Sequence, residues 1–232
     1  MQEETGRVDA QLYELLDEQL QGFVSGAAVV LGGRASCSVI LRLDGGVRRS
    51  ASSDPLAAAC DEVELAVGEG PCLDALETGL VMLVDDLGTE DRWPAWRRTA
   101  RAAGFRSSGG FPVHLRGDAA VAVNVYRPEP GPWDRDSLIR ADVYAQQLGR
   151  VVDLCLDLRE VTARRHALED ALAAQASIDQ AVGAIMASKH CDATTAFALL
   201  VAAARDGRSQ LSDVAVQILE ALVRREPGAP VS

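Results

Sequence analysis

Five cysteines and three histidines are the residues of this chain best suited to nucleophilic or metal chemistry. The cysteines are widely scattered and no two form a CxxC pair, which argues against a zinc ribbon or a disulfide framework. His114 alternates with apolar residues in a predicted strand and has no second ligand at metal-binding spacing. No nucleophile, base and orienting residue can be assembled. We therefore expect a cytoplasmic protein with reduced thiols and no metal or catalytic site, hence not an enzyme.

The segment Gly68-Glu69-Gly70-Pro71 resembles a phosphate-binding loop only in its glycines, because it lacks the Lys-Ser/Thr of a P-loop. It predicts a turn that leads into a helix beginning at Pro71. Cys72, at the start of that helix, suits either a reactive thiolate or a buried core thiol, and the second interpretation is the commoner one. The acidic run from Asp85 to Asp91 predicts a solvated loop rather than a cation site.

The charge balance excludes several classes of partner. With 23 basic and 34 acidic residues, the formal net charge is −11, whereas DNA-binding proteins and anionic membrane surfaces usually require a basic face. The N-terminal sequence has neither the basic n-region nor the apolar h-region of a signal peptide. The longest uncharged stretch, residues 19–33, is too short to span a bilayer. We expect neither DNA nor a membrane as a partner.

The first two-thirds of the chain alternates helical and strand patterns. Helical spacing of apolar residues predicts an opening helix over residues 8–23 and another over 93–103. Branched apolar runs predict strands over 35–43, 47–53, 80–84, 110–115 and 119–126, with a hairpin turn at Asp44-Gly45-Gly46. The 80–84 strand is expected to be buried. These elements predict an α+β fold built on an antiparallel sheet of about five strands.

The last third is helical. Asp134 is a plausible N-cap for a long helix over residues 137–187, and two shorter helices follow after Asp192 and Ser209. A heptad seam steps by 4 and 3 along the long helix: Leu154, Leu158, Val161, Arg165, Leu168, Leu172 and Gln175. The seam favours a homodimeric coiled coil, with its polar positions fixing register, over packing on the helix's own domain. The expected organisation is residues 1–158, then a three-helix module over 159–225, then a disordered tail over 226–232.

Residues 171–219 resemble the ANTAR domain, the RNA-binding three-helix module of bacterial transcription antitermination regulators. The matching core is Ile178-Asp179-Gln180-Ala181, Gly183, Ile185-Met186, Ala196-Phe197, Leu199-Leu200, and Leu211 with Asp213-Val214-Ala215. Residues 8 to about 158 resemble an actinobacterial-type GAF domain in the motifs VGEGPCLDAL, LVDDL, RWP, FPVHLRGD, NVY and WD. Together the two resemblances imply a GAF-ANTAR regulator, in which a sensor domain controls a module that binds hairpin RNA.

The resemblance implies that basic residues of the three-helix module contact RNA, but the balance of charged residues in this region argues against RNA binding. Between residues 163 and 232 there are seven basic and eight acidic residues, whereas phosphate contacts need a local surplus of cations. The available cations are Lys189, Arg205 and Arg208, assisted by Arg164 and Arg165. Family members typically carry basic residues at the positions of Gln175, Val182, Val201 and Gln210. Replacing Val182 and Val201 by Lys and Arg should strengthen RNA binding if both face solvent. Phe197, the only aromatic after Tyr144, is expected on the apolar face with Leu199 and Ala203.

Two functions from different classes follow. In the first, the chain is a signal-responsive antitermination regulator that binds hairpin RNA. In the second, it is a GAF sensor or protein-interaction dimer whose degenerate ANTAR module has lost RNA binding. The candidate residues for a small-molecule pocket in the sensor domain are Cys72, Trp96, Phe111 and Tyr126; the sequence names no cofactor and identifies no ligand. An enzymatic alternative, a GAF-type methionine sulfoxide reductase, would use clustered cysteines, and the spacing of Cys37, Cys60 and Cys72 does not resemble that active site.

Overall fold

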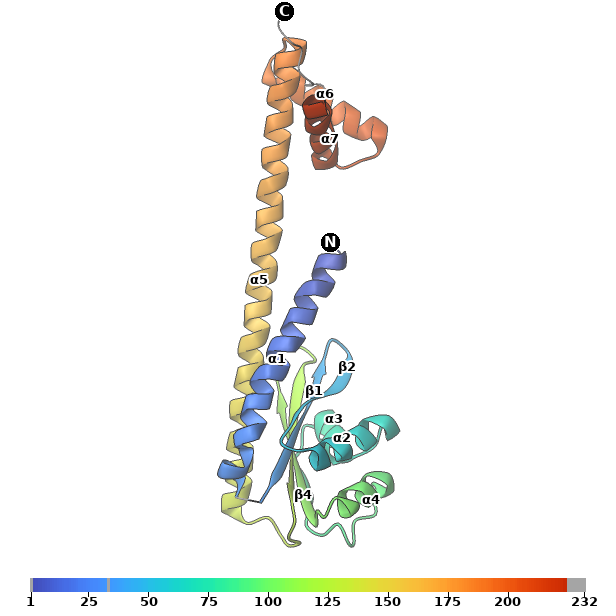
Figure 1. The fold of residues 1–232 in the computed structure, drawn as a ribbon, viewed down its shortest axis with the longest axis vertical. Helices are drawn as coiled ribbons and strands as arrows, with labels where there is room; N and C mark the ends of the chain where they lie inside the picture. The colour runs from blue at the N-terminus through green and yellow to red at the C-terminus, as the bar shows by residue number, and fades with distance from the viewer. Residues whose placement is uncertain (1, 33, 225–232) are drawn as a thin grey trace, which may run out of the picture. The chain divides into compact units, whose positions relative to one another are not determined.

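The computed structural model describes residues 2–32 and 34–224 of the chain (Figure 1). The chain divides into two compact units, Met1–Glu160 and Val161–Ser232. One helix, α5 (Arg135–Lys189), contains residues of both units, as the absence of Gly- and Pro-rich linker sequence predicts. Within the described ranges, no helix combines the length and apolar character needed to cross a bilayer.

The first unit is built on a five-stranded antiparallel sheet with strand order β2-β1-β5-β4-β3, which confirms the predicted α+β class. Its strands are β1 (Ser36–Leu43), β2 (Gly46–Ser52), β3 (Met82–Val84), β4 (Ser107–His114) and β5 (Ala120–Arg127). The β1–β2 hairpin turns where Asp44 and Gly45 both have positive φ, 52° and 76°, as the Asp-Gly signal predicts.

Strand β3 is the exception to the predicted burial. It is an edge strand that pairs only with β4, and it begins at Met82 rather than at residue 80. Leu80 and Val81 before it are 64% and 43% exposed, whereas Val84 is buried. The expectation of a buried strand over 80–84 was wrong, because an apolar run alone does not distinguish an edge strand from a central one.

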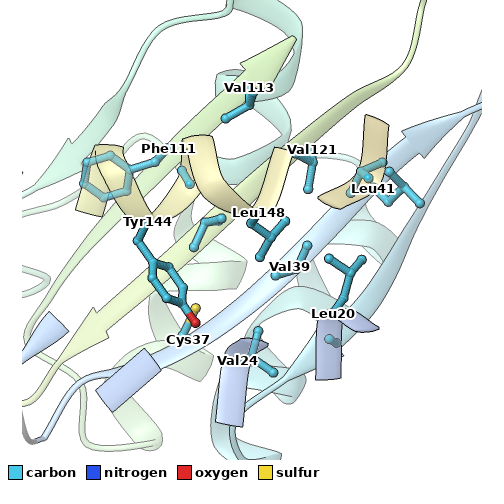
Figure 2. Close-up of a cluster of buried hydrophobic side chains, with 14 of the residues drawn as sticks. Leu20, Val24, Cys37, Val39, Leu41, Phe111, Val113, Val121, Tyr144 and Leu148 are labelled. Carbon is cyan, nitrogen blue, oxygen red and sulfur yellow. The ribbon is translucent and has the colours of Figure 1, made fainter. Parts of the chain in front are cut away.

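Helices α1 (Gln2–Leu31) and α5 cover one face of the sheet. Leu16, Leu20 and Val24 lie at helical spacing on α1 and are fully buried. Figure 2 shows Leu20 and Val24 facing alternate side chains of the central strands, with Leu148 of α5 beside them. The hydroxyl of Tyr144 on α5 donates a hydrogen bond to the backbone oxygen of Phe23. This core accounts for most of the apolar burial in the first unit.

Three short helices cover the opposite face: α2 (Pro55–Val67), α3 (Pro71–Thr78) and α4 (Pro94–Ala102). Each begins with proline, whose fixed φ and missing N–H suit the first helical position. The carboxylate of Asp54 accepts hydrogen bonds from the N–H groups of Leu56 and Ala57 and caps α2. Gly68, with φ of 78°, ends α2 in the left-handed conformation. Sequence reasoning predicted α3 and α4 but overlooked α2.

A capping hydrogen bond begins α5, and ion pairs farther along the helix join it to the turn between β4 and β5. Asp134 accepts a hydrogen bond of 2.8 Å from the Ser137 N–H, as its predicted capping role requires. Arg116, in the turn between β4 and β5, lies 2.5 Å from the Asp157 carboxylate and within 4 Å of those of Asp153 and Glu160. All of these groups are partly exposed, so we expect each pair to add less than about 1 kcal/mol.

The second unit combines the end of α5 with α6 (Ala193–Gly207) and α7 (Leu211–Arg224). The Asp192 carboxylate accepts a 2.7 Å hydrogen bond from the Thr195 N–H and caps α6 as predicted. The core consists of small and branched residues: Ala181, Leu200, Ala204, Val214 and Ala215. The predicted tail over 226–232 lies outside the described residues.

The apolar face expected for α6 was partly wrong. Ala196 and Leu200 are buried, whereas Phe197 and Leu199 are each 45% exposed and Ala203 is exposed. The buried positions repeat every four residues and are mostly alanine, so a narrow stripe is enough to pack α6 against its neighbours. The wider run of apolar residues on α6 leaves an aromatic side chain at the surface.

Candidate functional site

The candidate RNA-contacting residues of the second unit are all exposed. Arg205 lies in the last turn of α6, and Arg208 follows its end in the left-handed conformation, with φ of 49°. Lys189 is the last residue of α5, next to the start of α6. The fifteen residues of α6 rise by about 22 Å, so Lys189 and the arginine pair lie near opposite ends of this helix. The fold brings Arg205 and Arg208 together and leaves Lys189 apart.

Arg164 and Arg165 lie farther back along α5 and are also exposed. The guanidinium of Arg165 is 3.5 Å from the carboxylate of Glu169. A separation of 24 residues along α5 places Arg165 about 36 Å from Lys189. The five candidate cations therefore form three groups rather than one basic patch.

Phe197 lies on the same face of α6 as Arg205. Phe197, Val201 and Arg205 follow one another at four-residue steps, which keeps them on one side of the helix. Phe197 and Arg205 are exposed, and Val201 between them is half-buried. This face combines an aromatic ring with the Arg205 guanidinium, a combination that the expected burial of Phe197 had excluded, and Arg208 follows at the end of the helix.

The four positions at which the family typically carries basic residues have different surroundings here. Gln175 is exposed and its side-chain amide donates a 2.9 Å hydrogen bond to the Asp179 carboxylate. Gln210 is exposed just before α7. Val182 packs against the core of the second unit and Val201 is half-buried. The prediction that Val182→Lys and Val201→Arg strengthen RNA binding assumed that both side chains face solvent. That assumption was wrong.

The heptad seam of α5 is exposed along its apolar positions. Leu154, Leu158, Val161, Leu168 and Leu172 have exposed fractions between 51% and 63%. In the first unit the same helix buries a different face, which includes Leu148, Val152 and Leu156. Helices normally bury a continuous apolar stripe. The seam is such a stripe, but no part of the described chain covers it.

A buried polar cluster lies between the sheet and α2 in the first unit. Asp61 of α2 is fully buried, and its Oδ1 accepts hydrogen bonds from Ser38 (2.8 Å), Asn124 (2.9 Å) and Tyr126 (3.2 Å). Burial raises the pKa of Asp61 to about 7, even though these three donors favour the ionised form. A carboxyl group with this pKa changes its protonation state near neutral pH.

Glu64, one turn farther along α2, is also fully buried. Its Oε1 accepts hydrogen bonds from the N–H groups of Cys72 (2.5 Å) and Leu73 (3.2 Å), so its side chain caps α3. A Cβ at Gly70, the residue before α3, would lie 1.9 Å from Glu64 Cγ. Burial, and then the charge of Asp61, raise the pKa of Glu64 well above its ordinary value. The segment Gly68-Glu69-Gly70-Pro71 is thus a turn that makes room for this carboxyl group.

Three oxygen atoms of the cluster have no hydrogen-bond partner among the residues described: Asp61 Oδ2, Glu64 Oε2 and Asn124 Oδ1. Unpaired buried acceptors are costly and suit a donor-rich group. The described residues contain no group of three or more His, Cys, Asp or Glu arranged to hold a metal ion.

The structure places three of the four candidate pocket residues on one side of the sheet, in two separate buried clusters. Trp96 and Tyr126 lie with ring centroids 6.4 Å apart, and both are fully buried. Cys72 lies on the same side of the sheet, next to Glu64, and burial followed by the charge of Glu64 raises the pKa of its thiol well above the ordinary value. This favours the core interpretation of Cys72. Phe111 lies on the opposite face against Trp133, with ring centroids 5.5 Å apart, and takes no part in either cluster.

Sequence reasoning missed Asp61, Glu64 and the helix that carries them. The signals were Asp54 followed by Pro55, which together mark a helix start, and Gly68, which marks its end. The three acidic residues within PLAAACDEVELAV obscured the apolar pattern. The cysteines expected for a reductase are also dispersed: Cys37, Cys60 and Cys72 belong to three different buried clusters.

Comparison with known proteins agrees with this architecture. The family model of the GAF domain matches residues 16–153, and that of the ANTAR domain matches residues 166–219. The chain therefore belongs to the GAF domain family, and an ANTAR domain follows its GAF domain. ANTAR is an RNA-binding antitermination domain. No curated protein matches the chain.

Solved structures that are similar to the first part of the chain have low sequence identity to it. The GAF3 domain of a Synechocystis protein in its photoproduct state is 16% identical, with a TM-score of 0.50, over 63% of this chain and 98% of that one. A sensor histidine kinase domain from Sinorhizobium meliloti is 16% identical, with a TM-score of 0.49, over 64% and 97% of the two chains. A free methionine-R-sulfoxide reductase from Thermoplasma acidophilum is 12% identical, with a TM-score of 0.48, over 61% and 94%. The GAF-ANTAR architecture is typical of regulators that are not enzymes.

Proposed function

We propose that this chain is a signal-responsive transcription antitermination regulator in the cytoplasm, without enzymatic activity, and that it binds hairpin RNA through its second unit. The observation that carries this proposal is the ANTAR match over residues 166–219, on a helical module that exposes Phe197 and Arg205 on one face of α6 and Arg208 just after its end. Arginine contacts phosphate, and an exposed aromatic ring stacks on an unpaired base of a hairpin loop.

The proposed active form is a homodimer joined through the heptad seam of α5, a coiled coil. Five seam positions are apolar and more than half exposed, and pairing two such helices would cover them. Arg165 and Gln175 are the polar positions that would fix the register. A dimer also doubles the cations available to one RNA, which matters for a module with so few of them.

The dimer is tested with Leu158→Asp and Leu168→Asp. Both side chains are exposed in one chain, so each substitution should leave the fold intact and place a charge in the proposed interface. Light scattering at micromolar concentration should give a dimer for the unmodified protein and a monomer for these variants. Ala163→Asp, an exposed position on the opposite side of α5, is the matched control and should remain dimeric. A monomer before any substitution would overturn this part of the proposal.

RNA binding is tested by isolating the RNAs that the purified full chain retains from total cellular RNA at low salt, followed by sequencing. Hairpins should be enriched, and Arg205→Gln combined with Arg208→Gln should reduce the affinity for the recovered RNA at least tenfold. Arg164 and Arg165 on α5 and Lys189 at its end are secondary contacts with smaller expected effects. Arg135→Gln combined with Arg140→Gln, the same charge change in the first unit, is the control.

The second candidate function is a sensor or protein-interaction dimer whose ANTAR module no longer binds RNA. The observation that favours it is the acidic balance after residue 163 together with the separation of the cations into three groups. Absence of any retained RNA at low salt, from a protein that is folded and dimeric, would support this candidate and contradict the first.

We further propose that the signal reaches the GAF domain at the buried polar cluster, next to Cys72, Trp96 and Tyr126. The unpartnered atoms Asp61 Oδ2 and Asn124 Oδ1 accept hydrogen bonds, so they suit a small ligand with N–H or O–H donors, such as a protonated amine. A panel of small amines should include some that raise the unfolding temperature of the unmodified chain but not of Asp61→Asn. Phe111 lies on the opposite face of the sheet, so the same amines should still raise the unfolding temperature of Phe111→Leu.

A further inference from the structure

The strongest local concentration of positive charge in this acidic chain lies in the first unit, outside the polar cluster. Residues 92–106 contain five arginines and no acidic residue, whereas the whole chain has a net charge of −11. One of the five, Arg92, is neutralised by the buried carboxylate of Glu90, with an N···O distance of 2.6 Å. The other four need a different explanation.

These four arginines line one surface cavity. Helix α4 buries Trp96 and Ala100 toward the sheet, so residues of its other side form the cavity wall. The cavity has a volume of about 530 Å³, and it is lined by Pro94, Arg97, Arg98, Arg101, Ala102 and Arg106. This volume lies within the range of small-ligand sites.

Carboxylates do not neutralise these four arginines within the described part of the chain. Arg97 donates to the backbone oxygen of Glu90, and Arg106 donates to that of Phe105 at 2.7 Å. No ion pair involves Arg98 or Arg101 among the described residues. Four like charges around one cavity repel one another, and a bound anion would remove that repulsion.

We propose that this cavity binds a compact phosphate-bearing ligand, with a pyrophosphate group held among the arginines. Planar guanidinium groups bind phosphate oxygens through paired hydrogen bonds. The surroundings favour a compact anion over an RNA strand. The loop carrying Asp85, Asp86 and Asp91 adjoins the cavity, since the Leu87 N–H donates to the Arg106 backbone oxygen at 2.8 Å, and its carboxylates repel an extended phosphate backbone.

Inorganic pyrophosphate is the probe, titrated calorimetrically into the full chain at low salt. Binding should saturate at one site per chain, and Arg98→Gln combined with Arg101→Gln should weaken it at least tenfold. Both side chains are exposed, so the fold should persist, as circular dichroism can verify. Arg135→Gln combined with Arg140→Gln should change the affinity by less than twofold. No measurable binding to the unmodified chain, or equal loss in both double variants, overturns the proposal.

A second pair of substitutions separates paired hydrogen bonding from bulk charge. Arg98→Lys combined with Arg101→Lys keeps the charge but loses the planar fork, and it should weaken pyrophosphate binding several-fold. Unchanged affinity in this variant would mean that the cavity attracts anions only nonspecifically, contrary to the proposal. A single-stranded RNA and a hexaglutamate peptide serve as competitors, and displacement of pyrophosphate by either at equal phosphate or carboxylate concentration would assign the surface to a macromolecule instead.

Discussion

The two units of this protein hold their candidate functional groups in opposite ways. In the GAF domain, Asp61 and Glu64 are fully buried and bound by neighbouring donors. In the ANTAR domain, Phe197, Arg205 and Arg208 are all exposed. A buried site is shaped by the chain that contains it and can be described from that chain alone. An exposed face acquires its geometry from what binds it, which in the proposed function is an RNA or a second copy of the chain.

The largest expected effect is a difference in the free energy of unfolding when one aromatic residue from each unit is replaced by alanine. Trp96 is fully buried, so Trp96→Ala should lower the free energy of unfolding by about 3–5 kcal/mol. Phe197 is 45% exposed, and Phe197→Ala should cost less than about 1 kcal/mol while weakening RNA binding. Urea unfolding followed by circular dichroism measures both. Equal destabilisation by the two substitutions would contradict the difference between the units.

Glycine to alanine substitutions sharpen the same comparison. A Cβ at Gly70 would lie 1.9 Å from Glu64 Cγ, whereas one at Gly183 on α5 has no atom within 4 Å. Gly70→Ala should therefore destabilise the GAF domain by about 1–3 kcal/mol through overpacking. Gly183→Ala should stabilise the ANTAR module by up to about 1 kcal/mol, because glycine is a poor residue in the interior of a helix. Thermal unfolding of the two variants should shift in opposite directions.

The pH dependence of stability tests the buried carboxyl groups. The pKa of Asp61 is about 7 in the folded chain and near 3.8 when unfolded, so the unfolded chain releases this proton first. Stability should therefore fall as pH rises from about 4 to 7, by about 1.4 kcal/mol for each pH unit in which only the folded state retains the proton. Asp61→Asn should make this decline shallower and leave the contribution of Glu64, whose pKa is also raised. Asp206→Asn, at an exposed carboxyl of the ANTAR module, should leave the decline unchanged. A decline of the same slope in Asp61→Asn would refute the assignment.

The smallest effect concerns charge on the ANTAR surface. Gln210 is exposed at a position where the family typically has a basic residue, and Gln210→Lys should strengthen RNA binding about fivefold per subunit near 0.1 M salt. Gln217→Lys, also exposed but on α7, is the matched control. Filter binding over a range of salt concentrations should show a steeper salt dependence for Gln210→Lys alone. Equal gains from both variants would indicate nonspecific attraction.

Sequence reasoning recovered the elements whose signals are local. The Asp-Gly hairpin, the caps Asp134 and Asp192, and the long helix through residues 137–187 are fixed by residues close together in the chain, and the structure contains all of them. The heptad spacing on α5 predicts the seam without any knowledge of a partner, and the apolar positions of the seam are exposed in the structure.

The features that the sequence did not predict depend on contacts between distant segments of the chain. Helix α2 was overlooked because Asp61 and Glu64 look like solvent-facing residues, and only the donors of β1, β5 and α3 make their burial tolerable. Phe197 was assigned to the core because periodicity identifies an apolar helix but not how wide a stripe its neighbours cover. Both errors concern residues at the candidate sites.

The Glu64 carboxyl group also affects how the GAF domain opens. It belongs to α2, yet it holds the first backbone N–H groups of α3 at Cys72 and Leu73. Helix α3 has no side-chain cap of its own at Gly70, so its first turn loses these two bonds whenever α2 moves away. The amide hydrogens of Cys72 and Leu73 should then exchange with solvent at the rate at which α2 opens, and the two helices form one cooperative unit of local unfolding.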